Sequence, residues 1–163
     1  MKTLILFSVP LMQTAPLDLE TESFYLTRKE TIESQLEKVA NGMAEEILII
    51  SYETQRGTAC RGVAWERFSL EELRAAVACV GGMCIASLCR HLAQDYRSWC
   101  SGMPDLLVWR FKENGYEGEA KLVEVKSEKD RLSEQQRAWL LLLMDSGFNV
   151  EICKVRPASL IKT

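Results

Sequence analysis

A strand–hairpin–strand pattern restricts the fold of this chain more than any other feature of its sequence. Residues 105–111 form a mainly apolar run, and residues 120–126 form a second short run rich in apolar side chains, as strands do. Asn114-Gly115 lies between these two runs, and this dipeptide is typical of hairpin connections. The sequence therefore predicts two neighbouring antiparallel strands.

Helices are predicted on both sides of the hairpin. Capping-box pairs stand at Ser69 with Glu72 and at Ser133 with Gln136, and each marks the start of a helix. A helix from Thr27 to about residue 40 and another over residues 83–96 follow from apolar side chains at helical spacing. The apolar run at residues 47–50 fits a helix or a strand, and residues 149–155 complete the pattern as a final strand.

The order helix, strand, strand, helix, strand predicts a small α/β sandwich rather than a doubly wound sheet. A chain of 163 residues is close to the usual size of one domain. We divide it into an apolar N-terminal segment (1–15), a helical lead-in region (16–82) and a core (83–163).

The N-terminal segment allows two interpretations. Residues 4–12 are mostly apolar and follow Lys2, which resembles the apolar region of a signal peptide with Ala15 as a cleavage point. The chain would then be a small secreted domain. Otherwise the segment is a core strand or a truncated start. The run is too short to span a membrane, and we expect no membrane partner.

The six cysteines are scattered along the chain. A zinc site built from Cys84, Cys89, His91 and Cys100 is conceivable, but the sequence has no Cys-x-x-Cys pair and these spacings suit no common zinc module. Reduced, buried thiols of an intracellular protein are the simpler interpretation.

The charge balance limits the kinds of nucleic-acid binding that are open to this chain. Twenty Lys and Arg against 23 Asp and Glu give a net charge of −3, which argues against a purely electrostatic grip on DNA. A nucleic-acid enzyme remains possible, because catalytic carboxylates with bound cations can reverse the local field.

Pro104-Asp105 and Glu124-Val125-Lys126 are the candidate catalytic motif. Strand alternation places Glu124 and Lys126 on one face about 7 Å apart, and the hairpin brings Asp105 beside Glu124. Two close carboxylates repel unless a divalent cation lies between them, and the Val125 carbonyl adds a third oxygen. Lys126 can orient water and stabilise charge on a phosphoryl group. The plainer alternative is a solvated strand end.

Several segments around this motif together resemble the VRR-NUC nuclease domain of the Fanconi anaemia-associated nuclease family. They are Cys-Arg-His-Leu-Ala-Gln-Asp-Tyr-Arg (89–97), Gly-Met-Pro-Asp-Leu-Leu-Val-Trp (102–109), Lys-Leu-Val-Glu-Val-Lys (121–126), Asp-Arg-Leu-Ser (130–133) with Gln136 and Trp139-Leu140, and the lead-in residues 16–19 and 23–25. The resemblance extends over about residues 15–155. It implies a restriction-endonuclease-like PD-(D/E)xK fold with an N-terminal helical segment.

The resemblance also implies a function. This is a metal-dependent DNA nuclease that cuts branched DNA near 5′ flaps, acts as a 5′-to-3′ exonuclease, and takes part in interstrand crosslink repair in the nucleus, with DNA-repair proteins as possible partners. Asp105 and Glu124 would bind Mg²⁺ or Mn²⁺ through their carboxylates and Val125 through its carbonyl. Lys126 would be the catalytic lysine, and Gln136 either a supporting polar residue or only a helix cap.

The chain departs from the family pattern upstream of Pro16. The family's first acidic metal ligand lies in a Gly-Glu-Gly segment there, which this sequence lacks. Glu33, Glu37 and Glu53 are substitutes on the basis of charge alone. We therefore expect a C-terminal fragment or shortened form, and the alternative function is a catalytically incomplete module that binds DNA or a protein without cutting.

Overall fold

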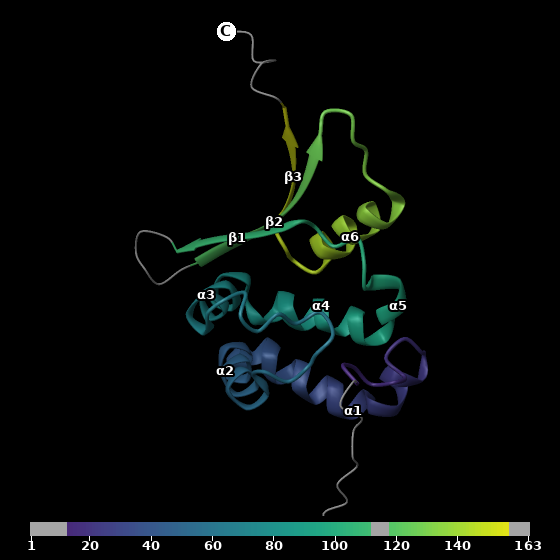
Figure 1. Ribbon diagram of the computed structural model, residues 1–163, viewed down its shortest axis with the longest axis vertical. Coiled ribbons are helices and arrows are strands. Elements are labelled where there is room, and N and C mark those ends of the chain that lie inside the picture. The colour runs from purple at the N-terminus through teal and green to yellow at the C-terminus, as the bar shows by residue number, and fades with distance from the viewer. Residues whose placement is uncertain (1–12, 112–117, 157–163) are drawn as a thin grey trace, which may run out of the picture.

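The computed structural model describes residues 13–111 and 118–156, and Figure 1 shows a helical half joined to a smaller sheet half. In chain order the elements are α1 (Ser23–Lys38), η1 (Val39–Met43), α2 (Ala44–Gln55), α3 (Leu70–Val80), α4 (Gly82–Gln94), α5 (Tyr96–Trp99), β1 (Leu106–Phe111), β2 (Gly118–Ser127), α6 (Glu134–Asp145) and β3 (Val150–Val155).

The helical half consists of α1 to α5. The chain turns sharply between α1 and α2 inside η1, where Gly42 adopts a φ of 98°, a conformation that glycine reaches without strain. Helix α3 begins with the predicted capping box, in which the Ser69 side chain accepts a hydrogen bond from Glu72 N. Helices α1 and α4 pack side by side.

The sheet is three-stranded and mixed, in the order β1-β2-β3. Strands β1 and β2 are antiparallel with Leu106 opposite Val123. Strands β2 and β3 are parallel with Lys126 opposite Lys154. The predicted hairpin, capped helix and final strand are thus confirmed, and the α/β class with them.

The two faces of the sheet differ. One face, which we call the covered face, packs against helices and carries Gly118, Leu122 and Glu124 of β2. A Cβ on Gly118 would collide with Cys79 of α3, so glycine is what lets α3 lie against the strand. The opposite face, which we call the open face, carries Leu106, Val108, Val123, Val125, Cys153 and Val155.

The core of the covered face is built around Trp139 of α6. Trp139 and Leu143 are fully buried and pack with Leu122. The Trp139 ring meets Trp99 edge-on at 5.1 Å between centroids, and its Nε1 donates to Ser101 O at 2.6 Å. These contacts fix α6 against β2, the strand that carries the Glu-Val-Lys motif.

Several details differ from the sequence-based predictions. Helix α1 begins at Ser23 rather than Thr27, and the ambiguous run at residues 47–50 is part of helix α2. Cys79 is buried as expected, whereas Cys89, Cys100 and Cys153 are exposed.

Two predictions about chain organisation stay predictions. The apolar run to residue 12 lies outside the described residues, and the division at residues 82 and 83 stays a prediction. Within the described ranges, no single helix has the length and apolarity to cross a bilayer. Helices α3 and α4 meet those criteria only as a pair, bent by 97°.

Candidate active site

The three residues of the predicted motif come together at one end of the covered face. Asp105 immediately precedes β1, and the register that pairs Leu106 with Val123 brings it level with Glu124. The Asp105 carboxylate oxygen Oδ2 accepts a hydrogen bond from the backbone N–H of Val125 at 2.8 Å. The hairpin therefore holds Asp105 beside the strand that carries Glu124 and Lys126.

Glu124 is the buried centre of this cluster. Only 1% of its surface is exposed, and burial of a carboxylate is costly unless it is paired. Its Oε1 atom lies 2.5 Å from Lys126 Nζ and accepts a hydrogen bond from Gln136 Nε2 at 2.6 Å. The Oε1 oxygen of Glu124 therefore has two polar partners.

The second oxygen of Glu124, Oε2, is buried and has no hydrogen-bond partner in the described part of the chain. A buried polar atom without a partner costs about 1–3 kcal/mol, and such atoms call for an explanation. A cation bound at Oε2 would remove this cost.

Lys126 has the carboxylates of Glu124, Asp105 and Asp130 near it. The hydrogen bond from Lys126 to Glu124 is the main cause that raises the pKa of the lysine, and the charges of Asp105 and Asp130 act in the same direction. The side chain is 12% exposed. Lys126 is thus a fixed positive charge at neutral pH, held next to the carboxylates rather than extended into solvent.

Gln136 serves both roles that the sequence left open. Its Oε1 accepts from Ser133 N at 3.1 Å, which completes the capping box of α6. Its Nε2 donates to Glu124. A single side chain therefore starts the helix and orients the buried carboxylate.

Asp130 is a member of the cluster that sequence reasoning missed. Its Oδ2 accepts from Ser127 N at 3.1 Å, and this bond lowers the pKa of Asp130. The residue closes the turn that follows β2 and adds negative charge near Lys126. An acidic residue three positions beyond a strand end is the signal that could have revealed it.

The donor set fits a hard divalent cation. Carboxylate and carbonyl oxygens are the ligands that Mg²⁺ and Mn²⁺ prefer, and the partnerless Oε2 of Glu124 lies in a cluster that also contains Asp105. The described residues contain no group of three or more His, Cys, Asp or Glu side chains placed to hold a metal ion. The protein side chains would therefore provide two carboxylates, with the Val125 carbonyl beside them.

Glu33, Glu37 and Glu53, the candidate substitutes for the missing acidic ligand, either pair with other residues or face solvent. Glu33 binds Arg90 through 2.8–3.1 Å contacts and accepts from the Tyr25 hydroxyl. The hydrogen bond from Arg90 is the main cause that lowers the pKa of Glu33. Glu37 and Glu53 are exposed on α1 and α2. The same ion pair engages Arg90 of α4.

This geometry defines the class of the protein. A mixed sheet with flanking helices, an aspartate after proline at one strand and Glu-x-Lys on the next is the PD-(D/E)xK type, a class that implies dependence on a divalent cation. Two solved structures of paFAN1 bound to 5′-flap DNA with a gap share this fold. They superpose with TM-scores of 0.74 and 0.76 at 25% and 26% identity, over 88% and 89% of this chain and 26% of theirs.

The chain belongs to the VRR-NUC domain family, whose model matches residues 39–157. It is 67% identical over 147 residues to the Fanconi-associated nuclease 1 homolog of Oryza sativa subsp. japonica. It is also 39% identical over 147 residues to Fanconi-associated nuclease 1 of Homo sapiens. These matches cover 90% and 88% of this chain but only 15% and 14% of the two relatives. The family indicates a nuclease, a hydrolase of phosphodiester bonds.

Proposed function

We propose that this chain is the catalytic module of a structure-specific DNA nuclease that cuts branched DNA near 5′ flaps. We propose a 5′-to-3′ exonuclease activity and a role in interstrand crosslink repair as well. The observation that carries the proposal is the buried, partnerless Oε2 of Glu124 next to Asp105 and Lys126. The names of the Fanconi-associated relatives and the 5′-flap DNA bound by paFAN1 support the choice of substrate.

Asp105 and Glu124 would hold Mg²⁺ or Mn²⁺ through their carboxylates, and Val125 through its carbonyl. The cation, when bound, supplies a Lewis acid that activates water and stabilises the phosphoryl charge. Lys126 supplies a fixed positive charge where negative charge grows on the phosphate oxygens. Gln136 keeps the Glu124 carboxylate in one orientation, as outer partners of metal ligands do.

The proposed cellular setting follows from the relatives. The names of the Fanconi-associated relatives support a nuclear location and DNA-repair proteins as partners, and we propose both. The net charge of −3 means that DNA binding depends on local positive charge and the cation rather than on the overall charge.

The test is cleavage of a labelled 5′-flap duplex in Mn²⁺ and in Mg²⁺, with EDTA as the metal control. The full chain and its Lys126→Ala and Asp105→Asn variants are compared at equal concentration. Lys38→Ala, which removes a lysine at the end of α1, is the matched control. We expect each site variant to lose at least about 100-fold in rate, the effect of removing one electrostatic stabiliser, while circular dichroism shows that it remains folded.

Two results would contradict the proposal. One is cleavage by Lys126→Ala at the wild-type rate. The other is a folded wild-type chain that cuts no flap substrate with either cation.

A further inference from the structure

Two lysines from neighbouring strands stand side by side at the end of the sheet that carries the candidate active site. The parallel register places Lys126 of β2 directly opposite Lys154 of β3, so the two side chains leave the same face of the sheet. Because β2 lies between β1 and β3, Lys154 is one strand further from Asp105 than Lys126 is. Neighbouring strands lie about 4.8 Å apart, and Lys154 therefore borders the site.

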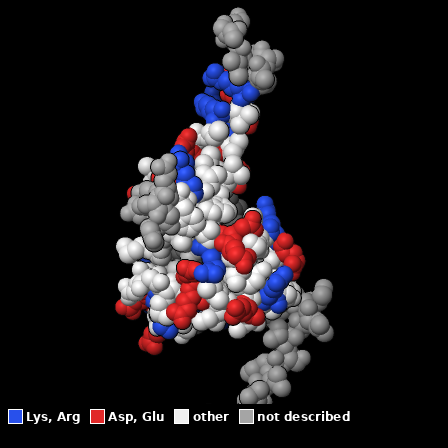
Figure 2. All heavy atoms as spheres, turned by 90° about the vertical axis from the view of Figure 1, so that its left-hand side faces the viewer, with Lys and Arg blue, Asp and Glu red and all other residues white. Residues whose placement is uncertain are grey.

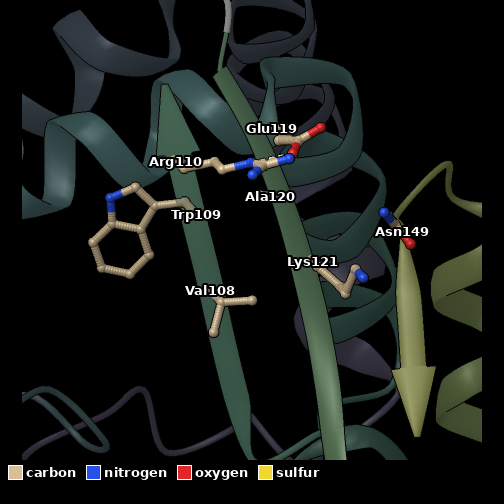
Figure 3. Close-up of a pocket in the computed structure, with 7 residues that line it drawn as sticks. All are labelled: Val108, Trp109, Arg110, Glu119, Ala120, Lys121 and Asn149. Atoms are coloured by element: carbon tan, nitrogen blue, oxygen red, sulfur yellow. Dashed lines mark hydrogen bonds and ion pairs between the residues drawn. The ribbon is translucent and has the colours of Figure 1, made fainter. Parts of the chain in front are cut away.

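This pairing differs from the other charged pairing in the sheet. Arg110 of β1 is opposite Glu119 of β2, and Figure 3 shows the two side chains meeting across the strands, in an ion pair of 2.5 Å. Among the residue pairs of the described sheet, Lys126 with Lys154 is the only one of like charge. Like charges directly opposite one another destabilise a sheet. The pair therefore calls for a reason other than stability.

The two lysines also differ in their partners. Lys126 Nζ lies 2.5 Å from Glu124 Oε1, and its side chain is 12% exposed. Lys154 is exposed, and no carboxylate of residues 13–111 or 118–156 lies within ion-pair distance of it. Lys126 is thus held inside the site, whereas the ammonium group of Lys154 is available to an anion from outside the chain.

Other basic side chains lie at the same end of the sheet. The turn after β2 carries Lys129 and Arg131, and neither forms an ion pair within the described ranges. Arg156, two residues beyond Lys154, approaches Glu128 only to 3.8 Å. Figure 2 shows Lys and Arg side chains gathered where β2 and β3 end. Basic groups without carboxylate partners are what binds a phosphate backbone, even in a chain whose net charge is −3.

We propose that Lys154 binds the DNA phosphodiester next to the one that is cut. Asp105, Glu124 and Lys126 surround the reacting phosphate, and Lys154 lies beside them on the side away from Asp105. A contact there fixes the register of the DNA backbone on the site and takes no part in the chemistry. The inference deepens the proposed function and rests on it for the choice of substrate.

The first experiment measures binding of a fluorescein-labelled 5′-flap duplex by anisotropy. EDTA keeps the duplex intact, and KCl is varied from about 50 to 200 mM. Lys154→Ala should weaken binding about 5-fold, the upper range for one exposed ion pair, and should reduce the slope of log K against log[KCl] by about 0.9, the effect of one lost phosphate contact. Lys154→Arg keeps the charge and should keep the slope.

Lys121→Ala is the matched control. It removes the same charge from the same sheet, but Lys121 binds Glu151 at 2.5 Å and lies on the open face. Its salt slope should equal that of the wild-type chain. A change confined to Lys154→Ala would therefore report a direct contact rather than the total charge of the protein.

The second experiment identifies the phosphate. Single methylphosphonates, each of which replaces one charged phosphodiester by a neutral one, are placed along the duplex around the cleavage site mapped with Mn²⁺. Neutralising the phosphate next to that site should weaken wild-type binding about 5-fold and should have no further effect on Lys154→Ala. This non-additivity is the signature of two groups in contact.

Steady-state cleavage in Mn²⁺ separates the contact from the chemistry. Removal of a contact that is equal in the ground state and the transition state raises KM and leaves kcat unchanged. Lys154→Ala should therefore raise KM about 5-fold at the wild-type kcat, whereas Lys126→Ala should lower kcat.

Three results would overturn the inference. They are a wild-type salt slope and KM in Lys154→Ala, equal changes in Lys121→Ala, and full additivity of Lys154→Ala with every methylphosphonate. The nuclease proposal is judged separately. A wild-type chain that binds the duplex through Lys154 but never cuts it supports the contact and contradicts the nuclease. A chain that cuts, with the KM unchanged in Lys154→Ala, contradicts the contact alone.

Discussion

The two faces of β2 differ in what surrounds them. On the covered face Leu122 and Glu124 are buried against α6 and the helices below it. On the open face Lys121 and Val123 retain exposure, and the charges there are matched in surface pairs. The same strand thus carries a preorganised site on one face and a partly exposed surface on the other.

This difference teaches that one strand can carry a preorganised site on one face and partly exposed side chains on the other. Glu124 contacts both Lys126 and Gln136 within this chain, and Asp105 binds the Val125 backbone beside them. The open face keeps partly exposed side chains in the described part of the chain. Variants on the two faces should therefore differ in what they damage.

The largest expected effect comes from the covered face. Trp139→Ala removes a fully buried ring and should lower the free energy of unfolding by about 3–5 kcal/mol. Leu141→Ala on the same helix, at an exposed position, should change it by less than about 0.5 kcal/mol. Urea unfolding followed by circular dichroism measures both. Equal losses would mean that the covered face is not the core.

The next effect concerns Gln136. Gln136→Ala removes the donor to Glu124 and should lower flap cleavage about 10- to 100-fold, as the loss of an outer partner does at other metal sites. The neighbouring Gln135, which bonds Ser98 O instead, is the control, and Gln135→Ala should retain the wild-type rate. A wild-type rate in Gln136→Ala would reduce that residue to a helix cap.

A smaller, pH-dependent effect is expected in the helical half. The Arg90 guanidinium lowers the pKa of Glu33 below its ordinary value of 4.5, so the pair stabilises the fold above that pH and the contribution disappears as the pH falls through the lowered pKa. Glu33→Gln should cost up to about 1 kcal/mol at pH 7. Melting temperatures of the two proteins should converge as the pH falls from 7 toward 3, and a constant difference would contradict the pairing.

The smallest effect is expected on the open face. Val108→Ala should change the stability of the isolated chain by less than about 0.5 kcal/mol, because the side chain is 45% exposed. A loss of 2 kcal/mol or more in the isolated chain would show that this face is packed after all.

Local patterns were enough to predict the sheet half. The short apolar run at residues 120–126 and the capping box at Ser133 predicted β2 and the start of α6, because both are short-range effects. The run at residues 47–50 was ambiguous, since periodicity cannot separate a short buried strand from a helix. Packing of α2 against η1 and α3 settled it.

Long-range contacts could not be predicted in the same way. The bond from Gln136 to Glu124 depends on how α6 lies against β2, and the pair of Arg90 with Glu33 joins residues 57 positions apart. Spacing alone does not contain such information. The catalytic roles of Asp105, Glu124, Val125 and Lys126 stay predictions that the geometry supports.

Binding of Mn²⁺ tests the central claim most directly, because it depends on the buried carboxylate and not on a substrate. Electron paramagnetic resonance measures free Mn²⁺ during titration of the wild-type chain and of Glu124→Gln, which keeps the size of the side chain. We predict that the wild-type chain binds the ion and that Glu124→Gln binds it at least 10-fold more weakly. Equal binding by the two folded proteins would contradict the assignment of Glu124 as a metal ligand.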